Sequence, residues 1–155
     1  SHYFGGKQGV IEAAVRHLLD QLKQGLLTRI AQAENPSALE RLMMVVETNF
    51  SGFQRSSSVT TAWLSFWGQA THDVGLARLQ AVNSKRLESN LRFSFRQLIE
   101  DPQKAAEAAR MTAAMIDGMW LRSTLSADKD RSFKESERLC KEFIHMQIHR
   151  FGSLV

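Results

Sequence analysis

The sequence has few residues that interrupt helices or cross-link a chain. Its 155 residues include only two prolines, Pro36 and Pro102, and nine glycines, so long helices are possible over most of its length. The single cysteine, Cys140, excludes an internal disulfide, and we expect it to be a small buried apolar residue. No secretory signal and no run of about 18 apolar residues is found, which excludes a membrane-spanning helix and favours a cytoplasmic location.

Several chemical signatures are also absent. The sequence has no nucleophile elbow, Walker loop or dinucleotide-binding fingerprint, and we therefore expect neither an enzyme nor a bound cofactor. His145 and His149 are four residues apart, but no Glu-x-x-His motif or second cysteine completes a site, so no metal is predicted. The net charge of +4 is mild, which is weak evidence for a nucleic-acid surface. We expect a solvated face from four basic residues, Lys85, Arg86, Arg92 and Arg96.

Apolar residues that recur at three- and four-residue spacing predict an all-α fold, a helical bundle of about six helices. The predicted helices span residues 9–33, 36–51, 59–72, 73–100, 102–125 and 131–151, with a polar loop over 52–58. The fifth helix begins with closely spaced alanines, which permit tight helix pairing. We predict that the last two helices of each protomer form a four-helix bundle in a homodimer. The alternative is that both helices pack only within the core of one protomer.

The fifth predicted helix contains an unusual stretch, TAAMIDGMWLRS, over residues 112–123. Asp117 lies there among apolar neighbours, and a buried carboxylate without a partner costs several kcal/mol or shifts its pKa. An arginine such as Arg122 or Arg16 could pair with it, which is the ordinary solution for a buried carboxylate. The other interpretation is that Asp117 is the counter-charge for a bound cation.

The third predicted helix carries three aromatic residues at helical spacing. Trp63, Phe66 and Trp67 stand at i, i+3 and i+4, so we expect all three rings on one face of the helix. Such a stripe can simply fill the core. It can also form an aromatic box for a quaternary ammonium ion, since ring faces attract a cation that has no hydrogen-bond donors.

Three segments resemble a known family. The residues SHYF, followed by Gly5, Gly6 and Lys7, resemble the end of the recognition helix and the next turn in TetR-family transcriptional regulators. The stretches WLSFW and MIDGMWLR, with the six-helix order, resemble the effector-binding and dimerisation domain of that family. Within the family they are most similar to choline-responsive repressors of the glycine betaine pathway. The resemblance covers residues 1–151.

The resemblance implies two parts. Residues 1–8 are expected to be the tail of a DNA-binding helix-turn-helix domain and its connector, and residues 9–155 the ligand-binding and dimerisation domain. Operator DNA would be bound only through helices that precede this sequence. The implied function is repression of genes that convert choline to glycine betaine, relieved by choline. Two alternatives remain, a TetR-like sensor of another cationic or apolar small molecule and a helical dimerisation module without a ligand.

The candidate ligand site follows from both arguments. We expect Trp63, Trp67 and Trp120 to form the walls, Asp117 to be the counter-charge and Asn49 to bind the hydroxyl group. The further candidates are Phe50 and Phe66 as additional rings, Met115 and Met119 as adaptable lining, and Glu47 as an alternative anion. Betaine should be disfavoured, because its carboxylate would repel the aspartate.

Overall fold

The computed structural model describes residues 6–152, except for the side chains of residues 7 and 8, and within that range it is all-α. The helices are α1 (Gly6–Gln32), α2 (Ala38–Asn49), α3 (Ser57–Ala70), α4 (Val74–Leu98), α5 (Pro102–Thr124) and α6 (Lys129–Phe151). A short 3-10 helix, η1 (Phe53–Arg55), lies within the segment expected to be a polar loop. The six-helix prediction is confirmed, with boundaries shifted by a few residues. The expected SHYF junction lies outside the described residues.

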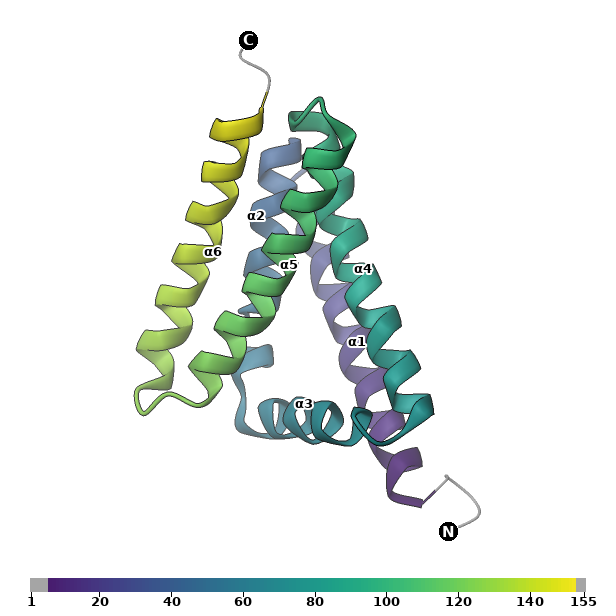
Figure 1. Cartoon of the computed structure of the whole chain (residues 1–155). Coiled ribbons are helices and arrows are strands. Elements are labelled where there is room, and N and C mark those ends of the chain that lie inside the picture. The colour runs from purple at the N-terminus through teal and green to yellow at the C-terminus, as the bar shows by residue number, and fades with distance from the viewer. Residues whose placement is uncertain (1–5, 153–155) are drawn as a thin grey trace.

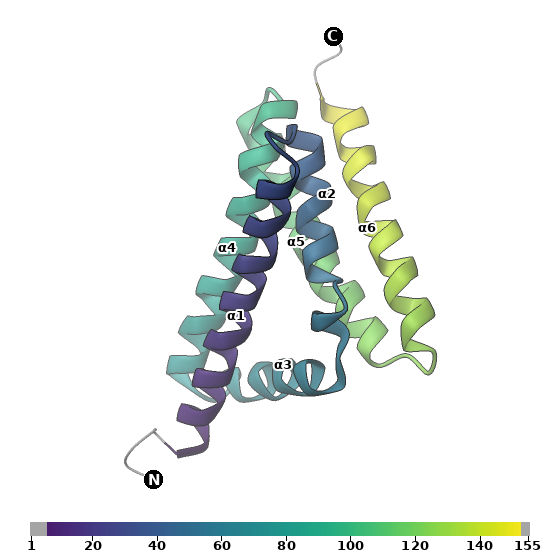
Figure 2. The same ribbon diagram turned by 180° about the vertical axis from the view of Figure 1, so that it is seen from behind.

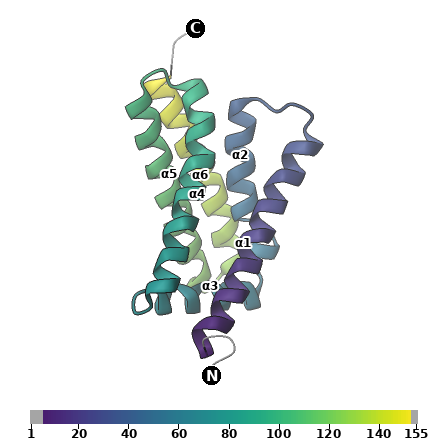
Figure 3. The ribbon, with the colours of Figure 1, turned by 90° about the vertical axis from the view of Figure 1, so that its right-hand side faces the viewer.

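Five helices run along the molecule, and α3 lies across it. In Figure 1, α4, α5 and α6 stand in front, with α5 between the other two, and α3 crosses one end of the bundle. Figure 2 shows α1 and α2 on the opposite side. α1 runs obliquely, and the loop that joins it to α2 lies at the end far from α3 (Figure 3). α3 therefore lies across one end of the bundle, in contact with α1 and α4.

Side chains that accept backbone N–H bonds fix where four helices begin. Ser37 and Glu40 form a capping box at the start of α2, in which each side chain accepts from the other's backbone N–H. The carboxylates of Asp73, Asp101 and Asp128 accept from the first turns of α4, α5 and α6. These caps satisfy N–H groups that have no partner within the helix. The boundaries are therefore encoded locally.

The core is formed by every helix, and α5 is at its centre. Small side chains on α5 let its neighbours approach, and these are Ala105, Ala108, Ala109, Thr112 and Ala113, all buried. The largest fully buried side chains include Phe66, Phe95 and Phe133. Cys140 is fully buried, which confirms the expectation, and burial raises the pKa of its thiol to about 12. No described helix is both long enough and apolar enough to cross a membrane.

Replacing one core ring tests this packing. Phe95 of α4 is 0% exposed, so Phe95→Ala should lower the free energy of unfolding by about 3–5 kcal/mol through lost burial and a residual cavity. Phe93 is 58% exposed on the same helix and stacks only on Arg41, with the guanidinium carbon 5.3 Å from the ring centroid. Phe93→Ala should therefore cost about 1 kcal/mol or less. Urea denaturation of the two variants would contradict the packing if their losses were equal.

Candidate functional site

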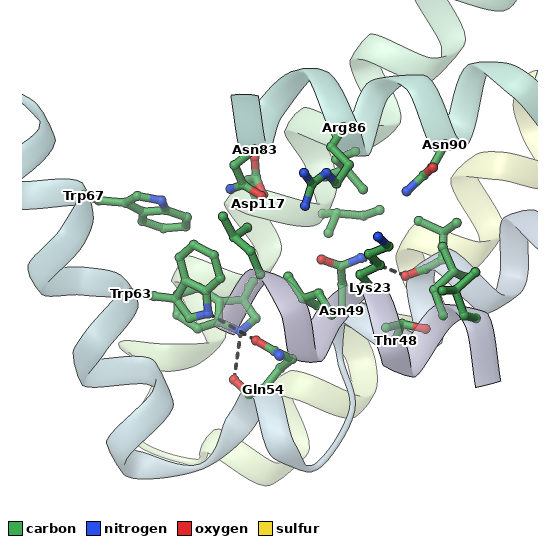
Figure 4. A pocket seen from close by; sticks show the side chains of 18 residues that line it. Lys23, Thr48, Asn49, Gln54, Trp63, Trp67, Asn83, Arg86, Asn90 and Asp117 are labelled. Atoms are coloured by element: carbon green, nitrogen blue, oxygen red, sulfur yellow. Dashed lines mark hydrogen bonds between the residues drawn. The ribbon is translucent and has the colours of Figure 1, made fainter. Parts of the chain in front are cut away.

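A cavity of about 360 Å³ lies where α3 crosses the bundle. Its walls come from five helices and η1 (Figure 4). The lining residues are Leu19, Leu22, Lys23, Leu26 and Leu27 of α1; Val45, Thr48 and Asn49 of α2; Gln54 of η1; Trp63 and Trp67 of α3; Asn83, Arg86, Leu87 and Asn90 of α4; and Ile116, Asp117 and Trp120 of α5. The volume is at the low end of the range of about 300–1,000 Å³ for small-molecule pockets. The lining combines apolar surface with a few polar groups, as ligand sites commonly do.

Three indole rings form one wall of the cavity. The ring centroids of Trp63 and Trp67 are 6.2 Å apart and tilted by 49°, and those of Trp67 and Trp120 are 5.5 Å apart and edge-to-face. Both distances are within the range for favourable aromatic pairs. The spacing of four residues brings Trp63 and Trp67 together on α3, while Trp120 comes from α5. Packing of α3 against α5 therefore completes the aromatic wall.

Each indole N–H has a definite acceptor. Trp63 Nε1 donates to Gln54 Oε1 at 3.1 Å, and Trp120 Nε1 donates to the backbone oxygen of Gln54 at 3.2 Å. Trp67 Nε1 donates to Gln80 Oε1 of α4 at 3.2 Å. Buried indoles normally find such a partner, and the bonds fix the orientation of each ring. The wall is therefore ordered without a ligand.

Asp117 is the only acidic residue of the cavity, and its charge is not compensated by an ion pair with any described residue. Burial raises the pKa of this carboxyl from 3.8 to about 6. Arg16 pairs with Glu12 at 2.7 Å, and Arg122 forms no ion pair with Asp117, so neither expected arginine neutralises it. An unpaired carboxylate of this kind is a functional-site candidate.

A second cavity of about 530 Å³ adjoins the first. It is lined by Ala70, Thr71, Ala77, Gln80, Gly118 and Leu121, together with Trp67 and Asp117, which line both cavities. The Trp67 ring and the Asp117 carboxylate therefore lie at the boundary between the two spaces. Besides Asp117, the second cavity has no ionisable lining residue, so the charged groups that share a cavity with Asp117 are Lys23 and Arg86.

The comparisons with known proteins concern most of the chain. Residues 38–149 match the family model described as BetI-type transcriptional repressor, C-terminal. The HTH-type transcriptional regulator BetI of Proteus mirabilis is 41% identical over 150 residues, covering 96% of this chain and 74% of the relative. The BetI regulator of Escherichia coli K12 is 44% identical over 135 residues, covering 85% of this chain and 69% of the relative. The chain belongs to the BetI-type family of transcriptional repressors.

Solved structures agree on the fold. A transcriptional regulator from Pseudomonas aeruginosa PAO1 superposes with a TM-score of 0.78 at 23% identity, covering 97% of this chain and 75% of the other. A transcriptional regulator from Rhodococcus superposes with a TM-score of 0.75 at 16% identity, covering 99% and 79%. The BetI-type family therefore accounts for the six-helix architecture and for the absence of catalytic signatures, since its members are regulators of transcription and not enzymes.

The cavity of this BetI-type domain contains some of the expected site residues and not others. Trp63, Trp67, Trp120, Asp117 and Asn49 line it. The other four candidates, Phe50, Phe66, Met115 and Met119, do not line it. Helical geometry explains the difference, because consecutive residues point about 100° apart and only one face of each helix borders the cavity.

The excluded residues have other surroundings. Phe66 is fully buried and packs edge-to-face on Trp63, and Phe50 packs on Phe133 in the same way. Met115 and Met119 are half-buried and pack against the edge of the core. Glu47 does not line the cavity either, because it pairs with Lys141 of α6 at 2.8 Å.

Sequence reasoning missed the part of the site that comes from α1 and α4. Asn83, Arg86 and Asn90 follow one another at three- and four-residue spacing, so they share one face of α4. The apolar residues near this face are Leu79, Leu87 and Leu91. Between these leucines the face is polar for about two turns. The sequence shows this interruption, but without an interleaved aromatic residue it predicts a solvated face and not a ligand site.

Burial of Asp117 predicts a distinctive pH dependence. The raised pKa means that the folded state disfavours the ionised form, so this group destabilises the fold above about pH 6 and has no such effect below its ordinary pKa of 3.8. Asp117→Asn should therefore raise the free energy of unfolding by up to about 3 kcal/mol at pH 8. The gain should shrink as the pH falls through 6 and vanish below about 4.

Urea denaturation between pH 4 and pH 8 measures this effect. Asp20→Asn is the matched control, because Asp20 is exposed on α1 and its substitution should change stability by about 0.5 kcal/mol or less. Loss of stability in Asp117→Asn at pH 8 would mean that the carboxylate has a stabilising partner after all.

Proposed function

We propose that this domain senses a small quaternary ammonium compound, with choline as the first candidate, and that ligand binding relieves repression of genes that convert choline to glycine betaine. The observation that carries the proposal is an ionisable carboxylate, with no ion-pair partner among the described residues, beside three ordered indole rings in one cavity. The BetI name of the relatives supports the same chemistry. We also propose that the domain works in the cytoplasm.

The physical argument concerns how a trimethylammonium group can be recognised. It carries a full positive charge but no N–H donor, so hydrogen-bond acceptors alone cannot hold it. Ring faces contribute about 0.5–2 kcal/mol each to cation binding, more when water is excluded. The Asp117 carboxylate adds a full negative charge, which a neutral ligand of the same shape could not use. Binding of a cation would also favour the ionised form of Asp117 and thus recover part of its burial cost.

A second candidate is a sensor of a larger molecule, and the cavity volume favours it. The cavity of about 360 Å³ lies within the range of about 300–1,000 Å³ for pockets that bind drug-sized ligands, and choline is smaller than such a ligand. Choline would therefore occupy only part of the space. A dimerisation module without a ligand is a weaker alternative, because it gives no reason for a half-buried carboxylate that lines a cavity.

We propose that α5 and α6 form the dimer interface. The outer side of this helix pair exposes apolar side chains that no described residue covers, among them Met111, Leu125 and Met146, which are 45%, 70% and 57% exposed. These features fit a four-helix bundle built from two copies of the pair.

The proposed mechanism is a shift between two orientations of α1. This helix supplies five lining residues, and at Gly25 it approaches α2 so closely that an added Cβ would lie 3.3 Å from Thr48 Cγ2. A ligand that fills the cavity would favour one tilt of α1. If residues 1–8 join α1 to a DNA-reading domain, as we predict, the tilt changes the separation of two recognition helices, which must be about 34 Å apart to read successive major grooves.

Isothermal titration with choline tests the ligand. The chain should bind choline saturably, and Trp67→Leu should weaken binding by about tenfold because one ring face is lost. Lowering the pH from 7.5 to 5 should also weaken binding, because Asp117 becomes protonated below about pH 6. Phe53→Ala is the control, since Phe53 is 44% exposed in η1 and does not line the cavity. Absence of saturable heat with the unaltered chain would reject choline.

Sedimentation velocity tests the dimer. The double substitution Met111→Glu and Met146→Glu places charges on the proposed interface and should shift a dimer toward the monomer by at least tenfold in dissociation constant. Val82→Glu is the control, because Val82 is 49% exposed on α4, away from the α5–α6 face. If the double variant remained a dimer and Val82→Glu dissociated, the interface would not be formed by α5 and α6.

A further inference from the structure

The cavity has a second, basic end that the proposed choline site does not use. In Figure 4, Trp63 and Trp67 stand at one side of the view, whereas Lys23, Arg86 and Asn90 lie away from them, toward the other side. Lys23 comes from α1 and Arg86 from α4, so these two helices contribute one cation each. Asn49, Asn83 and Asn90 add amide groups to the lining.

Neither cation is neutralised by the part of the chain that the structure describes. Four described basic residues, Arg16, Lys104, Arg138 and Lys141, form ion pairs with glutamates, and the other described basic residues form none. Lys23 and Arg86 form no ion pair or hydrogen bond with a described residue, although Asp117 lines the same cavity. Both side chains are exposed enough for water to solvate them while the cavity is empty. Their charges therefore remain available to a ligand.

Choline offers these two cations only a neutral hydroxyl group and no negative charge. A cation at the aromatic end gains from Asp117 and is repelled by Lys23 and Arg86, so a purely cationic ligand uses only half of the polar lining. A ligand with charges of both signs can align with the cavity, because its positive end meets the rings and Asp117 while its negative end meets the two basic side chains. The expectation that betaine is disfavoured rests on repulsion by Asp117 alone and does not include attraction by Lys23 and Arg86.

We propose that Lys23 and Arg86 form an anion subsite, so that the cavity takes a zwitterion with a quaternary ammonium at one end and a carboxylate at the other. The chemical class is the trimethylated amino acids. This inference rests on the proposed function, because it needs the ammonium group at the aromatic end. Arg86 supplies a planar fork of donors that suits a carboxylate, and Lys23 supplies a point charge.

The spacing between the two charges of the ligand should matter. The subsite is separated from the indoles, so a trimethylammonium carboxylate with a longer chain should reach it better than glycine betaine does. A matched pair of probes isolates the carboxylate, namely 4-(trimethylammonio)butanoate and 4-(trimethylammonio)butan-1-ol. The two have the same length and ammonium group, and they differ in the charge of the far end.

Isothermal titration at constant ionic strength is the test. The butanoate should bind the unaltered chain about tenfold more tightly than the butanol. Arg86→Gln combined with Lys23→Gln should abolish this preference, because it removes both cations that would bind the carboxylate of the butanoate. Lys85→Gln is the matched control, because Lys85 is the exposed neighbour of Arg86 and does not line the cavity, and it should keep the preference.

The outcomes separate this inference from the proposed function. Equal affinities of butanoate and butanol for the unaltered chain would overturn the anion subsite while leaving the ammonium site intact. A preference that survives the double substitution would also overturn it. If none of the trimethylammonium compounds binds, the proposed function and the subsite both fail.

Discussion

The site depends on one glutamine more than on any other residue. Gln54 accepts the N–H of Trp63 through its side chain and the N–H of Trp120 through its backbone, and it is only 4% exposed. One residue of η1 thereby fixes a ring of α3 relative to a ring of α5. Such bonds are costly to break in a buried setting, because they would leave two indole donors unsatisfied. The short 3-10 helix therefore determines where the crossing helix sits, and the crossing helix in turn determines the end of the cavity.

The three indole rings are held by hydrogen bonds, whereas burial destabilises the ionised form of the Asp117 carboxylate. The three indoles have their hydrogen-bond partners without a ligand, whereas Asp117 has a raised pKa and no ion pair with a described residue. A domain selected only for stability would replace this aspartate with an uncharged residue, since its ionised form is destabilising at neutral pH. Preorganised rings lower the entropic cost of binding, and an unsatisfied charge provides its driving force. Both features are expected when a ligand completes the polar interactions of a site.

The sequence predicted those parts of the molecule that depend on local spacing. The six helices follow from apolar periodicity and from caps such as Ser37 and Asp73, and the pairing of Trp63 with Trp67 follows from a spacing of four. The sequence alone could not show which other helices lie against the rings of Trp63 and Trp67. Phe66 directly precedes Trp67 in the sequence. It is nevertheless buried in the core, because adjacent residues of a helix point in different directions. Arg86 is exposed, as the predicted solvated face requires, and only the packing of α4 beside α1 shows that it also borders a cavity.

α1 connects the chemistry of the cavity to a mechanical output. It lies on one side of the ligand space and supplies Lys23 along with four leucines, so a ligand in the cavity contacts a helix whose other side faces away from the core. The leucines alone would let α1 slide over an apolar surface, because apolar contacts are not directional. A charged contact through Lys23 is directional, and a ligand anion held between Lys23 and Arg86 would join α1 to α4. The basic end of the cavity is therefore the part best suited to change the orientation of α1, while the aromatic end fixes the ligand against helices that are already joined through Gln54.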